Sequence, residues 1–220
     1  MLSRPNVFPV FLCVLGLYIS LYVKTVSKES VRKTIFWCLK SGFVVCLFVF
    51  FLFLYNKLRF DNWMDFGYTT INGAPEIVEA AETYGMFNIH FLPLNAKVMF
   101  TVLPRICTTG ERFWFYPYVV GYSMFLMAPY LIYAFRCIGK KPWIIGSWIS
   151  VFFIVVMLLL YHNTGAEQFG YRYFLDAVAP LVLLIGYGLK NRDDFIFKFL
   201  IVFSVCEQFV GMYWWYLGRI

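Results

Sequence analysis

Long apolar runs leave this chain few folds to choose from. They cover residues 8–23, 35–55, 119–135, 143–161, 173–189 and 196–216. A helix needs about 20 largely apolar residues to cross the hydrocarbon core of a bilayer. The composition agrees with this. In this chain 61% of the residues are hydrophobic and only 14% are charged, whereas soluble domains average about 45–50% apolar and about 25% charged residues. The sequence therefore predicts an all-α integral membrane protein with about six transmembrane helices.

The positive charge of the chain indicates its topology. A net charge of +7 would favour a nucleic-acid partner in a soluble protein, but here basic residues lie in short turns between apolar runs, where they mark the cytoplasmic side. Eleven of the 19 Lys and Arg residues fall in the short inner turns or at their edges, if both termini are outside. We therefore expect no nucleic-acid partner, and we place the one long loop, residues 56–118, on the outer face.

The long loop has two segments that predict short helices. Pro75 to Tyr84 begins with proline, carries acidic residues in its first half and is followed by Gly85, a typical helix stop. Asn95 to Val102 is apolar but too short to span. We expect both to lie along the bilayer surface as interfacial helices.

A polar stretch, His162 to Pro180, separates the fourth and fifth apolar runs. If a helix begins just before Arg172, then Arg172 and Asp176 lie four residues apart on one face, within reach of an ion pair. An arginine at membrane depth usually faces protein or a wet cavity. One interpretation is an anion-binding arginine held by Asp176, with Tyr171 and Tyr173 beside it. The alternative is an interfacial helix start, with Arg172 reaching lipid head groups and the tyrosines in the aromatic belt.

Three fragments carry a family resemblance. They are YNKLRF with a following FGY within residues 55–68, HNTGAEQFGYRYFLD at residues 162–176, and SRPN at residues 3–6. In order and spacing they resemble segments of the GT-C superfamily of membrane glycosyltransferases, polytopic enzymes that move sugars from polyprenyl-phosphate carriers on the outer face of the membrane. The second fragment is the most specific. The match covers essentially the whole chain, and it corresponds to the carboxy-terminal half of such an enzyme.

The resemblance implies a multi-pass protein of the prokaryotic plasma (inner) membrane. Its partners would be membrane lipid and a polyprenyl-phosphate sugar donor, and no cofactor is implied. The catalytic acid of this superfamily usually lies in the first outer loop, and this chain begins past that point. The resemblance therefore implies that this chain is a carboxy-terminal portion that is not catalytically complete alone. An upstream or separate amino-terminal half would be a further partner. The alternative from another class is a non-enzymatic membrane subunit or scaffold.

Glycosyl transfer from a lipid phosphate needs positive groups for the phosphate and a base for the acceptor hydroxyl. The resemblance and the residue chemistry together nominate substrate-binding residues: Arg172, Asp176, Gln168, Tyr171, Tyr173 and Arg59. Arg105 is a further cationic candidate, with an interfacial role as its alternative. The catalytic residue is unknown, and the candidate outer-face bases, each with a solvated or ion-paired role as its alternative, are Asp61, Asp65, His90, Glu111 and Glu167.

Two further features have mainly structural interpretations. Glu207 and Gln208 lie inside the sixth run, where an acid must face a cavity or hydrogen-bond a neighbouring helix. We favour the structural role. The six cysteines and two histidines show no metal-ligand spacing, so we expect no metal site.

Overall fold

A computed structural model describes residues 8–22, 28–63, 75–106, 115–116, 120–165, 168–190 and 193–217. Its α-helices are α1 (Val10–Tyr22), α2 (Lys28–Phe60), α3 (Pro75–Tyr84), α4 (Leu92–Phe100), α5 (Met124–Met127), α6 (Pro142–Leu160), α7 (Val178–Leu189) and α8 (Phe195–Leu217). Its 3₁₀ helices are η2 (Ile89–Phe91), η3 (Pro129–Arg136) and η4 (Arg172–Ala177). Strand β1 (Arg105–Ile106) pairs antiparallel with β2 (Phe115–Tyr116). Apart from this short pair the described chain is helical, which confirms the all-α fold class.

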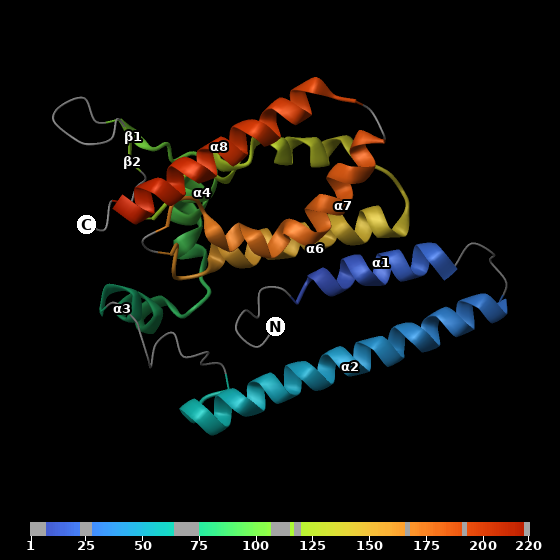
Figure 1. Cartoon of the computed structure of the whole chain (residues 1–220). Helices are drawn as coiled ribbons and strands as arrows, with labels where there is room; N and C mark the ends of the chain where they lie inside the picture. The colour runs from blue at the N-terminus through green and yellow to red at the C-terminus, as the bar shows by residue number, and fades with distance from the viewer. Residues whose placement is uncertain are drawn as a thin grey trace.

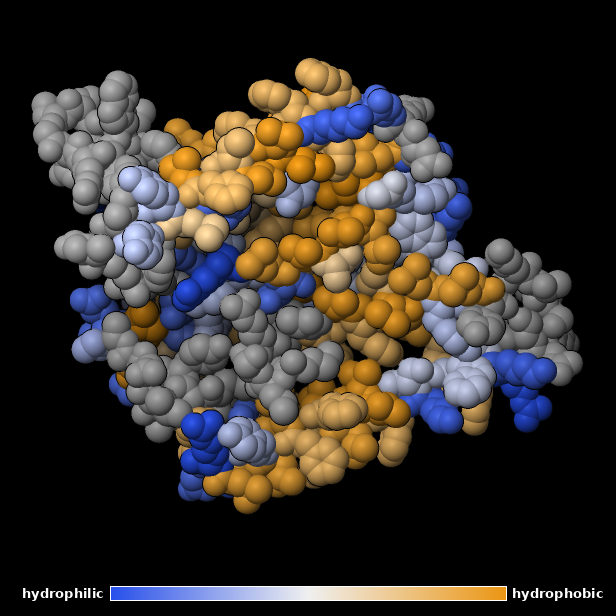
Figure 2. All heavy atoms as spheres, in the orientation of Figure 1, coloured by the Kyte–Doolittle hydropathy of each residue, from blue (hydrophilic) through white to orange (hydrophobic). Residues whose placement is uncertain are grey.

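Four helical segments are long and apolar enough to cross a membrane. They are Arg32–Phe60, Pro142–Leu160, Arg172–Leu189 and Phe195–Tyr213, and Val10–Leu21 is a shorter apolar helix. Helix α6, with 19 residues, is about 28 Å long, close to the hydrocarbon core of about 30 Å. Figure 2 shows a broad apolar band with the hydrophilic residues gathered toward its sides. Length and composition thus indicate a membrane protein, and the number of six spans stays a prediction.

The helices follow one another in layers (Figure 1). Helix α1 packs on α6, α6 on α7, α7 on η3, and η3 on α8, while α2 packs lightly against α1. Ile154 and Leu158 of α6 and Leu184 of α7 are 0% exposed and form the centre of the core. Most of α2 is exposed, including a series of phenylalanines, which is the pattern of a helix surrounded by lipid.

Small residues bring α1 and α6 into close contact. A Cβ atom on Gly146 would lie 2.4 Å from the Leu12 carbonyl oxygen, and one on Gly16 would lie 2.6 Å from the Pro142 carbonyl oxygen. The Ser150 hydroxyl donates to the Pro9 carbonyl at 2.7 Å. Small residues and serine hydroxyls at a helix interface are typical of membrane proteins.

The expected third span, residues 119–135, does not form one regular helix in its described part, residues 120–135. Ser123 caps the short helix α5 by accepting from the Phe125 N–H group, and Pro129 then opens η3 in 3₁₀ geometry. Proline lacks the N–H group that a continuous α-helix would use. The eight residues of η3 extend only about 16 Å, which is too short to cross the hydrocarbon core. Helix η3 packs against α7 and α8.

The structure of the long loop agrees in part with the sequence-based prediction. The helix predicted for Pro75–Tyr84 is confirmed as α3, and it is followed by Gly85 at a φ of 81°. The second predicted segment, Asn95 to Val102, is helical through Phe100 as part of α4, which begins earlier, at Leu92. Helix α2 extends beyond the predicted range of 35–55 at both ends, so the first fragment of the family resemblance continues a helix through Phe60. The interfacial position of these loop helices stays a prediction.

Candidate functional site

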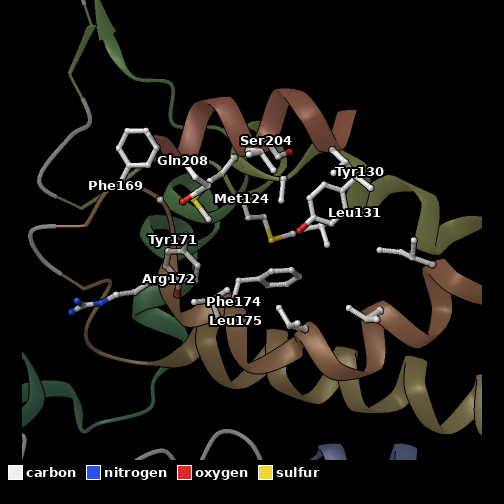
Figure 3. Close-up of a pocket in the computed structure, with 18 of the residues that line it drawn as sticks. Met124, Tyr130, Leu131, Phe169, Tyr171, Arg172, Phe174, Leu175, Ser204 and Gln208 are labelled. Atoms are coloured by element: carbon white, nitrogen blue, oxygen red, sulfur yellow. The ribbon is translucent and has the colours of Figure 1, made fainter. Parts of the chain in front are cut away.

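A groove of about 860 Å³ lies between α5, η3, α7 and α8. Its body is lined by apolar side chains, among them Leu131, Phe174, Val182, Ile185, Leu189 and Ile201. Figure 3 shows Tyr171, Arg172 and Gln208 together toward one end, while Tyr130 and Leu131 lie toward the other. Gln168 also lines the groove. The result is a long apolar cavity with a polar and cationic end.

The polar end is built from the segment that follows α6. The Asn163 side chain accepts from the Gly165 N–H group at 2.7 Å, and this closes a tight turn. Gly165 has a φ of 88°, which a glycine adopts readily. A Cβ atom there would also lie 2.8 Å from Gln168 Oε1. Glycine at this position therefore makes the turn possible and leaves room for the Gln168 carboxamide.

Gln168 ties this segment to the chain before α5. Its Nε2 atom donates to the Val120 carbonyl at 2.6 Å and to the Thr164 carbonyl at 2.8 Å. With the nitrogen committed to two carbonyl oxygens, Oε1 is left as an acceptor. The side chain is 3% exposed, so its hydrogen bonds are made largely away from water. Gln168 thus serves first as a brace of the site.

Backbone contacts extend this brace into a seam between residues 120–122 and 168–171. Tyr122 and Gly170 form an isolated parallel bridge, and the Tyr171 N–H group donates to the Tyr122 carbonyl at 3.2 Å. Gly121, with a φ of 82°, would place a Cβ atom 3.0 Å from the Gly170 carbonyl carbon. A Cβ atom on Gly170 would in turn meet Met127 Sδ at 1.8 Å. Close packing therefore leaves little room for a side chain at Gly121 and, unless Met127 shifts, at Gly170.

Arg172 and Asp176 do not form the predicted ion pair. Arg172 is exposed, and its guanidinium carbon lies 5.7 Å from the centre of the Tyr173 ring, whereas Asp176 is buried. Both residues belong to η4, and with three residues per turn positions i and i+4 point about 120° apart. The prediction assumed an α-helix, in which they would share a face. Figure 3 shows the Arg172 side chain extending outward from the polar end of the groove.

The structure groups four of the six predicted substrate-binding residues with the groove or beside it. Gln168, Tyr171 and Arg172 line it, and the Tyr173 ring lies 6.0 Å from the Tyr171 ring. Arg59 is elsewhere: it lies in the last turn of α2, donates to the Tyr55 hydroxyl at 3.0 Å and does not line the groove. Arg105 begins β1 and likewise lies outside the groove lining.

The candidate bases lie in different surroundings. Asp61 is exposed and pairs with Lys57, whose ammonium hydrogen bond holds the pKa of the Asp61 carboxyl below its ordinary value. His90 is exposed and stacks on Tyr84, with ring centres 4.0 Å apart. Neither residue lines the groove. The other three candidates, Asp65, Glu111 and Glu167, lie outside the described residues. Within the described ranges no three His, Cys, Asp or Glu residues form a metal-ligand group.

Buried polar atoms without a hydrogen-bond partner occur at the end of the molecule that holds the polar end of the groove. They include atoms of Asn95, His162, Gln168, Tyr171 and Glu207. The Asn95 amide nitrogen donates to the Tyr161 carbonyl at 2.7 Å, so Asn95 lies beside the carboxyl end of α6, where His162 follows. An unsatisfied buried polar group costs about 1–3 kcal/mol. Such atoms are suited to ordered water or to a polar ligand.

Two residues of this end, Tyr122 and Glu207, form a contact that the sequence did not indicate. Glu207 accepts a hydrogen bond from the Tyr122 hydroxyl, which is consistent with the structural role favoured for it. Tyr122 itself was not singled out, although it is 1% exposed and central to the seam. In a chain with 16 tyrosines, many of them near apolar runs, no sequence signal separates a buried tyrosine from one in the aromatic belt. Comparisons with protein-family models, with curated proteins and with solved structures found no match.

Proposed function

We propose that this chain is the carboxy-terminal portion of a GT-C-type membrane glycosyltransferase that takes its sugar from a polyprenyl-phosphate carrier. The observation that supports this most is the groove, because it combines an apolar body with a cationic end at Arg172. A lipid-linked sugar has the matching parts: a long hydrocarbon chain, an anionic phosphate and a hydroxyl-rich head. The hydrocarbon chain of the lipid would lie in the groove between α7 and α8, and its phosphate would meet Arg172.

The chemistry of the polar end fits an anionic head group. A guanidinium offers a planar set of donors that matches phosphate oxygens, and Arg172 is exposed at the mouth, where it can turn toward a ligand. Since Asp176 is buried in η4, we assign the phosphate to Arg172 alone and give Asp176 no direct part. Among the described residues, none that lines the groove is an Asp, Glu or His, so we name no catalytic base.

We further propose that the chain crosses the prokaryotic plasma membrane six times, with the polar end of the groove at the outer face. On this topology Arg136, Lys141 and Lys198 lie inside, at the opposite end of α6 from His162. Single-cysteine variants at Asn163 and Lys140, made in a cysteine-free chain, test this with a membrane-impermeant maleimide on intact cells. Labelling at 163 and protection at 140 are expected. The reverse pattern would contradict the orientation.

Transfer of radiolabelled sugar from polyprenyl-phosphate donors in membranes tests the function. Wild type is compared with Arg172→Ala, with Arg172→Lys, which keeps the charge, and with Arg59→Ala, a matched arginine outside the groove. We expect transfer only when the amino-terminal half is supplied, a strong loss in Arg172→Ala, a partial loss in Arg172→Lys and normal transfer in Arg59→Ala. If no transfer occurs with any amino-terminal half, the non-enzymatic membrane subunit becomes the better reading.

A further inference from the structure

The chain next to the segment that carries Arg172 is connected to α8 by a part-buried hydrogen bond. The Tyr122 hydroxyl donates to Glu207 Oε1. Tyr122 is 1% exposed, and Glu207 lies half-buried in the second half of α8. A carboxyl group in an apolar membrane helix is costly and is typically kept for a role. Tyr122, the partner of this carboxyl group, therefore indicates which part of the protein α8 holds in place.

Tyr122 contacts the residues just before Arg172 in two ways. Its ring centre lies 5.0 Å from that of Phe169, and its carbonyl accepts from the Tyr171 N–H group as part of the bridge to Gly170. Phe169 adds a second contact to α8, since a Cβ atom on Gly211 would lie 2.5 Å from its ring. Tyr122 thus links Glu207 of α8 to the backbone of residues 169–171, which directly precedes Arg172.

The same turn of α8 also faces the groove. Gln208 lines the groove, while Glu207 meets Tyr122, and successive residues of an α-helix point about 100° apart. The position of α8 therefore sets both the width of the polar end and the anchoring of the segment that carries Arg172. A shift of α8 would move both together.

We infer that Glu207 is a positioning residue that, through Tyr122, fixes where the Arg172 guanidinium stands at the polar end of the groove. The inference rests on the proposed function, because it concerns the phosphate end of that groove. It predicts a specific effect on head-group recognition. Removing the Tyr122–Glu207 hydrogen bond should weaken recognition of the phosphate and leave binding of the hydrocarbon chain intact.

The test measures the affinity of the full chain in nanodiscs for two probes, a polyprenyl monophosphate and the uncharged polyprenol of the same length. Wild type is expected to prefer the phosphate by about 10- to 100-fold, the range of a charge-assisted hydrogen bond. Tyr122→Phe, which removes only the hydroxyl, and Glu207→Leu should each reduce this ratio about 3- to 10-fold with the polyprenol affinity unchanged. Glu207→Gln should retain the ratio, because its carboxamide oxygen still accepts from Tyr122.

A double variant separates positioning from a general loss of structure. In an Arg172→Ala chain, which has little phosphate preference left, adding Tyr122→Phe should change nothing, because the two substitutions remove the same recognition. An unchanged ratio in Tyr122→Phe would overturn the inference. So would an equal loss of affinity for both lipids together with a lower melting temperature. A wild-type chain that does not prefer the phosphate would overturn the proposed function of Arg172 as well, which distinguishes the two failures.

Discussion

Replacing Gln168 with leucine tests whether its carboxamide braces the polar end of the groove. The substitution removes the two hydrogen bonds from Nε2 to the Val120 and Thr164 carbonyls. A buried carbonyl left unpaired costs about 1–3 kcal/mol. Val120 and Thr164 are half-buried, so water can partly replace the lost donor. Leucine also removes Gln168 Oε1, a buried atom without a partner, so we expect the free energy of unfolding to fall by only about 1–2 kcal/mol.

Equilibrium unfolding of the purified chain in detergent measures this loss, and hydrogen exchange locates it at the Tyr171 N–H group, which bonds to the Tyr122 carbonyl. Gln168→Glu keeps the shape but faces two carbonyl oxygens with a carboxylate, so it should destabilise at least as much at neutral pH. Gln208→Leu, an exposed glutamine of the same groove, is the matched control. A Gln168→Leu chain within about 0.5 kcal/mol of wild type, the range of a neutral surface change, would refute the reasoning.

Three other predictions follow from the packing and the charges. Gly146→Val places side-chain atoms against the backbone of α1, where even a Cβ atom would lie 2.4 Å from the Leu12 carbonyl oxygen. The free energy of unfolding should fall by at least about 1–3 kcal/mol. Gly186→Ala, whose Cβ atom would meet nothing within 4 Å, is the control. Burial lowers the pKa of His162 below its ordinary value, so the unfolded chain binds the proton more readily, and thermal stability should fall as pH drops below about 6.5; a His162→Gln chain that keeps the same dependence would contradict this. Asp194 accepts from Arg136 and from the Tyr133 hydroxyl at 2.7 and 2.9 Å, so Asp194→Ala should lower the melting temperature more than Asp194→Asn does.

Local patterns predicted the parts of this fold that local chemistry determines. Pro75, the acidic residues of α3 and the Gly85 that follows it lie within eleven positions, and the bounds of that helix follow from them. The apolar runs of α6 and α8 likewise require no partner to be recognised. The 3₁₀ geometry of η4 was not predicted, because the spacing of Arg172 and Asp176 also suits an α-helix, and the contact of the preceding Tyr171 with Tyr122, about 50 residues away, is not visible in the sequence.

The sequence was sufficient to predict which residues belong to the candidate site, but not how they are arranged in space. Sequence reasoning identified Gln168, Tyr171 and Arg172, since they share one unusual polar segment. It could not anticipate the groove, which arises where α8 packs on η3 after Pro129 interrupts the expected third span. It also paired Arg172 with Asp176 by α-helical spacing, and the tighter turn of η4 directs them apart.

Helix α2 is longer than a bilayer is thick, and this sets the height of the loop that follows it. Its 33 residues extend about 50 Å, against a hydrocarbon core of about 30 Å. If the apolar run of residues 35–55 lies in the core, the segment 56–60 rises about 7 Å beyond it as rigid helix. The loop would then start at the outer edge of the head groups, so α2 acts as a spacer that carries this end of the loop across the head-group layer.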